Sequence, residues 1–380
     1  MRALHVITGL GVGGAEQQLR LLLRHLPAEC DVVALTNPGP VAAGLAADGV
    51  RVTHLGMRGN RDLGALPRLA RLIRAGGYDL VHTHLYRACF YGRIAARLAG
   101  VRAVVATEHS IGATRLEGRP LTAGVRALYL AGERLGHTTV AVSPTVAERL
   151  RHWGVPGPRI HVIPNGIDAP RFRFDEVRRK EARAYLGLPE DAYVIGGVGR
   201  LAPGKRFDLL VRALTQLPGD VRLLLVGGGS EAWPLRRIAL GLGVADRVVL
   251  TGERPALPDP GDDAPDLAAL LSAMDVLASP SAEESFGLAV VEALAAGLPV
   301  LYASCPAVED LPPDAAPGAR RVMGDEGAYA RELLRLRAAG PGERTAPAAV
   351  HRYDIACSAR QLMNVYTAAL SGSTLEVSSP

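Results

Sequence analysis

Residues 3–26 read ALHVITGLGVGGAEQQLRLLLRHL, and the rest of the chain repeats the pattern of this stretch. The apolar run at 3–8 predicts a buried strand, and a glycine-rich loop follows it at 9–14. Apolar residues spaced by three and four then predict a helix over 15–26. Strands that alternate with helices in this way predict a parallel sheet covered on both faces.

The pattern runs through the chain in two series. The first series predicts strands at 3–8, 31–36, 51–55, 79–84, 102–107, 138–143 and 160–164, and helices at 15–26, 62–75, 87–99 and 144–152. It restarts after about residue 172, with strands at 193–199, 221–227, 247–252, 274–280, 298–302 and 319–323, and helices at 205–217, 230–242, 264–273, 287–296 and 326–338. A last helix is expected at 355–370.

Two such series predict an α/β fold with two doubly wound, Rossmann-like domains that face a cleft. We place the first domain at residues 1–172 and the second at 173–352, with a final helix and tail at 353–380. The charged segment from Arg171 to Arg183 is predicted to link the two domains. Ligands of such sheets bind beyond the carboxyl ends of the strands, so the loops that follow strands are the candidate site.

Composition excludes several classes of protein. The chain of 380 residues is 48% hydrophobic, which excludes a disordered chain, and no apolar run approaches the length of a membrane-spanning helix. Four separated cysteines without a CxxC pair argue against a disulfide framework or a structural zinc site. The start MRALHVIT lacks the long apolar core of a signal peptide, so we expect a cytoplasmic, reducing location. Aromatic residues make up only 4% of the chain, too few for stacking on nucleic acid.

The glycine loop at 9–14 matches the pattern G-x-G-x-x-G, which is typical of dinucleotide-binding proteins. A dehydrogenase would need an acidic residue at the end of the second strand, where this chain has Thr36 and Asn37. We therefore expect Gly13 and Gly14 to face a different anionic ligand, at the amino end of the helix that follows.

Two cations flank a turn after the first strand of the second domain. Arg200 and Lys205 lie five residues apart in GRLAPGK, so both can converge on one anion such as a diphosphate. The chain contains 43 basic residues of which only two are lysines, Lys180 and Lys205. A generic surface cation would be arginine in this composition, so the lysine at 205 points to a specific role.

Two glutamates, Glu284 and Glu292, lie eight residues apart around the start of the predicted helix at 287–296. Glu284 is expected in the preceding loop and Glu292 about one turn inside the helix. A carboxylate accepts hydrogen bonds from the two hydroxyls of a ribose. The backbone amides of Phe286, Gly287 and Leu288 would point at the same pocket as the two cations.

Together these segments resemble glycosyltransferase family 4, whose members are retaining, nucleotide-sugar-dependent enzymes with the GT-B fold. The resemblance covers nearly the whole chain and rests on the order of its motifs. They are GGAE at 13–16, DLVHTH at 79–84, Thr107-Glu108-His109, Ser143, IPNGID at 163–168, Gly199-Arg200 with Lys205, VGGG at 226–229, and ESFG at 284–287 followed by Glu292-Ala293-Leu294. Ser285 and the segment SCPA at 304–307 depart from the glycines usual in the family.

The resemblance implies a role for each site residue. Arg200 and Lys205 would neutralise the leaving diphosphate, Glu292 would hold the ribose, and Glu284 would position the donor sugar. His109 would face the transferred sugar from the first, acceptor-side domain. The last helix would cross back to pack on that domain.

The implied reaction is retaining transfer of a sugar, with UDP as the default carrier, in glycan or glycoconjugate biosynthesis. The acceptor would be a glycan, a lipid-linked molecule or a small molecule. No cofactor and no metal are expected, because no Asp-x-Asp pair occurs, and His82 and His84 suggest no third ligand. A UDP-sugar 2-epimerase-like enzyme and a non-enzymatic nucleotide-binding module remain alternatives.

The first part of the chain is strongly basic. Residues 1–168 hold 20 arginines and 11 acidic residues, a net charge of +9. In the predicted helix at 62–75, Arg68, Arg71 and Arg74 share one face, opposite an apolar stripe. This pattern suits a helix lying on an anionic membrane, and equally a surface helix packed on its own sheet. We therefore expect an acidic or membrane-borne acceptor, and a peripheral membrane contact as one of two interpretations.

Overall fold

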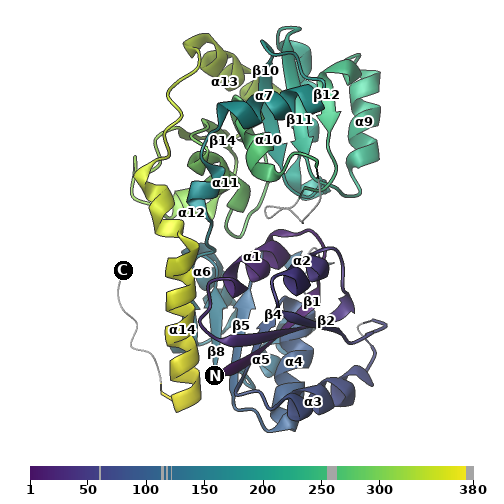
Figure 1. The fold of residues 1–380 in the computed structure, drawn as a ribbon, viewed down its shortest axis with the longest axis vertical. Helices are drawn as coiled ribbons and strands as arrows, with labels where there is room; N and C mark the ends of the chain where they lie inside the picture. The colour runs from purple at the N-terminus through teal and green to yellow at the C-terminus, as the bar shows by residue number, and fades with distance from the viewer. Residues whose placement is uncertain (60, 113–114, 117–118, 121, 255–262, 374–380) are drawn as a thin grey trace. The chain divides into compact units, whose positions relative to one another are not determined.

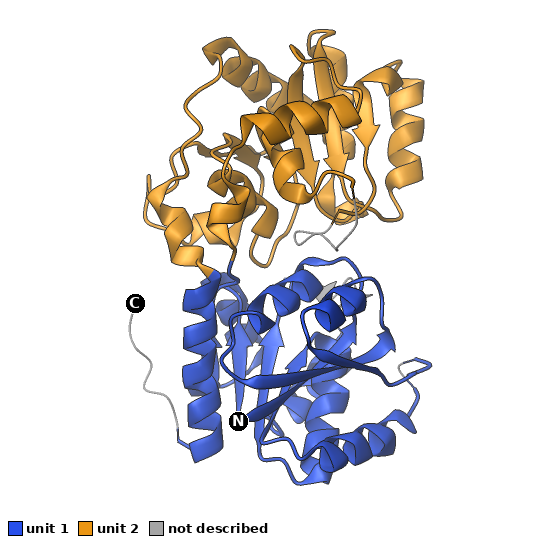
Figure 2. Ribbon diagram, viewed as in Figure 1, with its two compact units in different colours: residues 1–166, 355–380 blue, residues 167–354 orange. Residues whose placement is uncertain are grey.

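The computed structural model describes the chain except residues 60, 113–114, 117–118, 121, 255–262 and 374–380. The chain forms two compact units, residues 1–166 with 355–380 (unit 1) and residues 167–354 (unit 2), coloured separately in Figure 2. The last helix, α14 (Ile355–Ser371), belongs to unit 1, although it follows unit 2 in sequence (Figure 1).

Unit 1 is built on a parallel sheet of seven strands, and all seven predicted strands are confirmed. The order across the sheet is β3-β2-β1-β4-β5-β8-β9. The strands are β1 (Arg2–Gly9), β2 (Glu29–Asn37), β3 (Arg51–His54), β4 (Leu80–His84), β5 (Ala103–Glu108), β8 (Thr138–Ala141) and β9 (Ile160–Val162). A separate antiparallel pair joins β6 (Arg115–Leu116) to β7 (Arg119–Pro120).

In the described part of unit 1, the α-helices between these strands are α1 (Gly14–Leu23), α2 (Val41–Ala47), α3 (Ala65–Gly76), α4 (Tyr86–Ala99), α5 (Ala123–Glu133) and α6 (Pro144–Trp153). Helices α2 and α5 were not predicted from the sequence. Helix α2 reads VAAGLAA and buries only Val41, Gly44 and Leu45, so its apolar pattern is too short to indicate a helix.

Unit 2 contains a second parallel sheet, in the order β12-β11-β10-β13-β14-β15, and all six predicted strands are confirmed. They are β10 (Tyr193–Val198), β11 (Val221–Val226), β12 (Val248–Leu250), β13 (Val276–Ser279), β14 (Val300–Tyr302) and β15 (Ala319–Arg321). The α-helices are α7 (Glu176–Tyr185), α8 (Asp208–Ala213), α9 (Ala232–Gly241), α10 (Leu267–Ala273), α11 (Leu288–Ala295), α12 (Pro306–Glu309) and α13 (Glu326–Ala339).

Both sheets are doubly wound, as predicted. In unit 1 the direction of winding reverses between β1 and β4, and in unit 2 it reverses between β10 and β13. The loops that follow these two neighbouring strands diverge to opposite faces of the sheet, which leaves a ligand-sized crevice at their carboxyl ends in folds of this type. The functional residues are therefore sought at these two switch points.

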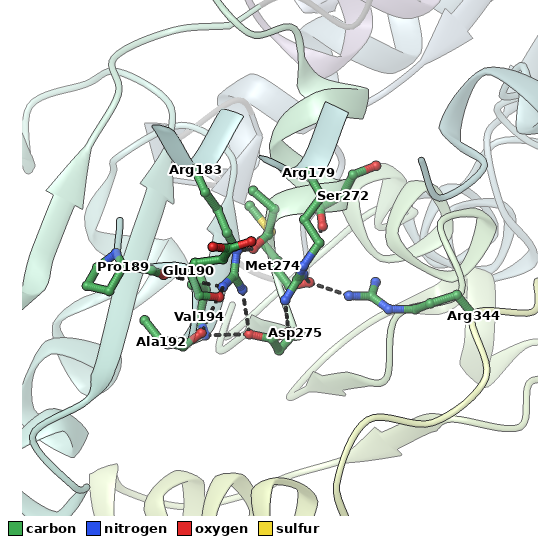
Figure 3. A network of polar contacts seen from close by, with 11 residues as sticks. Arg179, Arg183, Pro189, Glu190, Ala192, Val194, Ser272, Met274, Asp275 and Arg344 are labelled. Atoms are coloured by element: carbon green, nitrogen blue, oxygen red, sulfur yellow. Dashed lines mark hydrogen bonds and ion pairs between the residues drawn. The ribbon is translucent and has the colours of Figure 1, made fainter. Parts of the chain in front are cut away.

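The predicted linker from Arg171 to Arg183 is wrong, because these residues form part of unit 2. Asp175 caps helix α7, accepting hydrogen bonds from two backbone amides of the first turn. Arg179 and Arg183 then turn inward to Asp275, at 2.7 and 2.9 Å, and to backbone carbonyls around it (Figure 3). Two of the charges that suggest a solvated linker in the sequence, the partly buried Arg179 and the buried Arg183, are thus partners of one carboxylate.

The basic helix α3 is a surface helix packed on its own unit. Leu69 and Ile73 are fully buried in the core, and Leu66 packs against the same cluster, so the apolar stripe faces inward. Arg68 forms an ion pair with Asp62 at 2.9 Å. The apolar face that a membrane-lying helix would insert is therefore occupied by the core of unit 1.

In the part of the chain that the structure describes, no helix combines the length and the apolar character needed to cross a membrane.

Candidate functional site

Two predicted site residues, Lys205 and Glu284, meet at the switch point of unit 2. Lys205 ends the short turn after β10, and Glu284 lies in the loop between β13 and α11. The Lys205 ammonium donates a hydrogen bond to Glu284 Oε1 at 2.5 Å. The backbone holds the loops together as well, since the Ala282 amide donates to the Gly204 carbonyl at 3.0 Å. Because β10 and β13 are neighbours in the sheet, their loops emerge side by side.

Arg200 lies on the same loop as Lys205, and its side chain is exposed. Among the described residues its guanidinium takes part in no ion pair, whereas Lys205 is already engaged. Gly199, which precedes Arg200, has a φ of 141°, and the Lys205 side chain passes over it: a Cβ there would lie 3.6 Å from Lys205 Cε. The loop thus presents one oriented ammonium and one guanidinium that is available to an anion.

The loop after β11 packs against the loop after β10, backbone against backbone. A Cβ at Gly227 would lie 1.9 Å from the carbonyl oxygen of Gly199, and one at Gly229 would lie 2.3 Å from that of Leu201. The Leu201 amide donates to Gly228 at 2.7 Å. Side chains at these glycines would push the loops apart, so glycines 227 and 229 fix the position of the Arg200–Lys205 loop.

Helix α11 begins next to Glu284. Its N-cap is Gly287, with a φ of 101°, and a Cβ at that position would lie 2.5 Å from Cys305 Sγ. Phe286 is buried edge-on against Tyr353, with ring centroids 5.1 Å apart. The first amides of a helix have no partner within it, so those of Leu288 and Ala289 are donors at the carboxyl edge of the sheet. The Val290 and Val291 amides already donate to the Gly287 carbonyl. The packing of this turn against Cys305 was not predicted from the sequence.

Glu292 is buried rather than exposed on the helix surface, with 9% of the residue accessible. Burial raises the pKa of its carboxyl from the ordinary 4.5 to about 7. Near neutral pH this carboxyl therefore lies close to the midpoint of its titration. A ligand that donates hydrogen bonds to the charged form would drive the proton off.

The raised pKa makes a prediction about stability. Between pH 4.5 and 7 the unfolded carboxyl has lost its proton while the folded one keeps it, so the free energy of unfolding falls as the pH rises. Glu292→Gln mimics the protonated form and removes this dependence. We expect the variant to gain on the order of 3 kcal/mol over the natural protein at pH 8, and little at pH 4.5.

Urea unfolding at both pH values measures the effect, with Glu343→Gln, at an exposed glutamate, as the matched control. A difference between Glu292→Gln and the natural protein that is equal at both pH values would contradict the assignment.

The glycine loop of unit 1 follows β1 at the other switch point. Helix α1 begins at Gly14, with Gly13 as an N-cap that has extended backbone and no side-chain cap. A Cβ at Gly11 would meet no atom within 4 Å, so the loop is open there. The structure thus places Gly13 and Gly14 at the start of helix α1. The Glu16 carboxylate lies at the same end, 2.4 Å from where a Cβ of Gly13 would stand, so binding of an anion by this loop stays a prediction.

Four histidines gather on one face of the sheet of unit 1. His5 on β1 and His82 on β4 are register partners, His84 lies further along β4, and His109 follows β5. Burial lowers the pKa of His5 to about 3 and that of His109 to about 4, and places those of His82 and His84 well below 6.5. All four rings are therefore neutral at pH 7.

The sequence suggested no third metal ligand beside His82 and His84, but the structure places His5 there. One ring nitrogen from each of the three lies within 4.8 Å of the others. Both ring nitrogens of each of these three histidines, however, already have hydrogen-bond partners, which are neighbouring histidines, Tyr366 or Thr107. The buried histidines therefore form a hydrogen-bonded network. The β1–β4 pairing brings together His5 and His82, which are 77 positions apart, so no local sequence motif could indicate their contact.

The two halves of the chain match two family models. Residues 12–171 match Glycosyltransferase Family 4, and residues 192–338 match Glycosyl transferases group 1. A D-inositol 3-phosphate glycosyltransferase of Catenulispora acidiphila is 35% identical over 287 residues, which is 68% of this chain and 65% of that protein. The one of Mycobacterium tuberculosis strain F11 is 36% identical over 243 residues, 60% of this chain and 48% of that protein. The chain thus spans 65% and 48% of the length of these two relatives.

Solved structures share the fold of the chain. Anabaena HepE in complex with UDP and glucose has a TM-score of 0.82 at 23% identity, covering 97% of this chain and all of that one. Sucrose-phosphate synthase from Thermosynechococcus elongatus has a TM-score of 0.76 at 23% identity, covering 98% and 100%. With glycosyltransferase models matching both of its parts, the chain belongs to the glycosyltransferases of the GT-B fold, family 4 in its first part and group 1 in its second.

Proposed function

We propose that the protein is a retaining, metal-independent glycosyltransferase that moves a sugar from a UDP-sugar to an acceptor hydroxyl. The observation that carries this proposal is the Lys205–Glu284 pair beside the start of helix α11, at the switch point of unit 2. A donor needs a cation and amide donors for its diphosphate and an acceptor of hydrogen bonds for its hydroxyls. Lys205, the first amides of α11 and Glu284 supply the cation, the amide donors and the acceptor at one edge of the sheet.

The candidate site residues of unit 2 take roles that their chemistry supports. Lys205 and Arg200 bind the diphosphate and balance the negative charge that develops as the sugar leaves. The first amides of α11 donate to the same phosphate oxygens. Glu292 accepts hydrogen bonds from the ribose hydroxyls, and the proton that its raised pKa retains is released on binding.

The retaining step needs no protein nucleophile in this proposal. The bond from the anomeric carbon to the diphosphate oxygen breaks, and the acceptor oxygen bonds to the same face of that carbon. The departing diphosphate oxygen takes the proton of the acceptor hydroxyl. Arg200 and Lys205 take the place of a divalent cation, because their charges meet the charge on the leaving group.

The acceptor, in our proposal, carries phosphate. The relatives named above are D-inositol 3-phosphate glycosyltransferases, and the first part of this chain carries a net charge of +9. This excess of arginine favours an anionic acceptor, because guanidinium groups bind phosphate in two-point contacts.

Binding and turnover together test the function. We expect UDP-glucose, at 100 times its dissociation constant, to raise the free energy of unfolding of the purified protein by ~2.7 kcal/mol. GDP-glucose and ADP-glucose at the same concentration should raise it less. UDP release should then depend on an acceptor and be faster with D-inositol 3-phosphate than with inositol. Isomerisation of the UDP-sugar without an acceptor would instead identify an epimerase, and binding without any turnover would identify a nucleotide-binding module.

Chelation tests the metal-free mechanism separately. We expect the same rate of UDP release in EDTA as in magnesium, because Arg200 and Lys205 supply the positive charge. Loss of activity in EDTA that magnesium restores would overturn this part of the proposal.

A further inference from the structure

A continuous chain of hydrogen bonds runs through unit 1 and ends at His109. Its strand residues come from β1, β4 and β5, and Tyr366 joins it from helix α14. The links are Thr107 Oγ1 to His82 Nε2 (2.7 Å), His82 Nδ1 to Tyr366 Oη (2.6 Å), Tyr366 Oη to His5 Nε2 (3.4 Å), His5 Nδ1 to His84 Nε2 (3.0 Å) and His84 Nδ1 to His109 Nε2 (3.2 Å). The remaining nitrogen, His109 Nδ1, is buried and has no partner among the described residues.

The number of hydrogens couples the links to one another. A neutral imidazole has one N–H and one lone pair, and a phenol has one hydrogen to donate. Each member can therefore donate to one neighbour only if it accepts from the other, so all links point the same way. In one direction, from Thr107 outward, His109 Nδ1 carries a hydrogen. In the opposite direction it carries a lone pair.

The hydroxyl of Thr107 selects between the two directions. If the links run outward, this hydroxyl donates to His82. If they run inward, it accepts from His82, and its own hydrogen then needs a second acceptor. In the described structure His82 is the hydrogen-bond partner of this buried hydroxyl. A buried donor left unpaired is costly, so the outward direction is favoured.

We propose that this chain of hydrogen bonds fixes the tautomer of His109, so that the ring presents an Nδ1–H donor to an oxygen of the bound substrate. His84, His5, Tyr366 and His82 are then positioning residues, which act through His109 and do not touch the substrate. The ring nitrogen that carries the proton is set by the bond that the other nitrogen makes, and here that bond is His84 to His109. The substrate contact rests on the proposed function, whereas the tautomer of His109 does not.

Nuclear magnetic resonance of the full chain labelled with ¹⁵N-histidine reads the tautomer directly, with His109→Asn to assign the signal. We expect His109 to be a single Nδ1–H tautomer at pH 7 in the ligand-free protein. Tyr366→Phe removes the hydroxyl that links His82 to His5 and leaves the ring in place. In this variant we expect a mixture of His109 tautomers, and a kcat about tenfold lower with KM for the donor unchanged, as for the loss of one hydrogen bond.

Tyr78→Phe is the matched control. The buried Tyr78 hydroxyl donates to Asp31, in the same unit but outside the chain of hydrogen bonds that ends at His109. It should leave the His109 tautomer unchanged and kcat within about twofold. If Tyr366→Phe does not fold, His5→Phe cuts the next link and should give the same mixture. An Nε2–H tautomer in the natural protein, or an unchanged tautomer in the folded cut variants, overturns the inference. Absence of transferase activity with the expected tautomer would refute only the proposed function.

Discussion

Lys205→Ala should lower kcat by about 10²–10³-fold, the largest effect on activity that we expect from one substitution. The ammonium is held in place by Glu284 at 2.5 Å, so it is oriented before the donor binds. Charge develops on the diphosphate only as the sugar leaves, and an oriented cation stabilises that state more than the bound donor. Steady-state kinetics at saturating donor measures the effect.

Lys180→Ala is the control, because Lys180 is the other lysine of the chain and lies 61% exposed on helix α7, 3.9 Å from Glu176. It should leave kcat unchanged. Nearly normal turnover of a folded Lys205→Ala variant would remove this residue from the reaction. Lys205→Arg, which keeps the charge but not its shape, should recover part of the lost rate.

Asp275→Asn should lower the free energy of unfolding by about 3 kcal/mol or more, the largest effect on stability. This carboxylate receives hydrogen bonds from the guanidinium groups of Arg179 and Arg183 (Figure 3). Arg344 bonds to the backbone carbonyl of the preceding residue, Met274, and burial lowers its pKa to about 10. Asparagine keeps the shape of the side chain but leaves these partly buried cations without their counter-charge.

Asp208→Asn serves as its control, since Asp208 pairs with Arg212 at 3.9 Å on an exposed helix face. Such a surface pair contributes less than about 1 kcal/mol. Denaturant unfolding of both variants compares the two sites. Equal losses in both would show that Asp275 contributes no more than a surface charge.

The sequence alone predicted both sheets. The inner strands of the two parallel sheets follow from apolar runs, because a strand covered on both faces must be apolar along its whole length. The edge strands β3 (RVTH) and β15 (ARR) lack such a run and are more exposed. Helices with a long apolar face, such as α3 and α4, were predicted from apolar residues spaced by three and four. Short helix α2 was missed, since few of its residues face the core and its pattern is correspondingly weak.

The candidate site could be predicted in part. The residue types and loop positions singled out Lys205, Glu284 and Glu292, because loops after parallel strands share one edge of a sheet. The contact between Lys205 and Glu284 joins residues 79 positions apart and required the β10–β13 pairing. The burial of Glu292, and with it the raised pKa, likewise depends on what packs around α11.

The two sheets, their strand-helix alternation and the residue types at the loop ends could be predicted, because periodicity and glycine placement are properties of neighbouring residues. The positions of buried charges and protons became visible with the three-dimensional contacts. These contacts turned Arg179 and Arg183 from a predicted linker into partners of Asp275, and they brought His5 from β1 and Tyr366 from α14 to the histidines of β4. The physical reason is that burial and hydrogen-bond direction depend on neighbours in space, which a strand pairing or a returning helix supplies from distant parts of the chain.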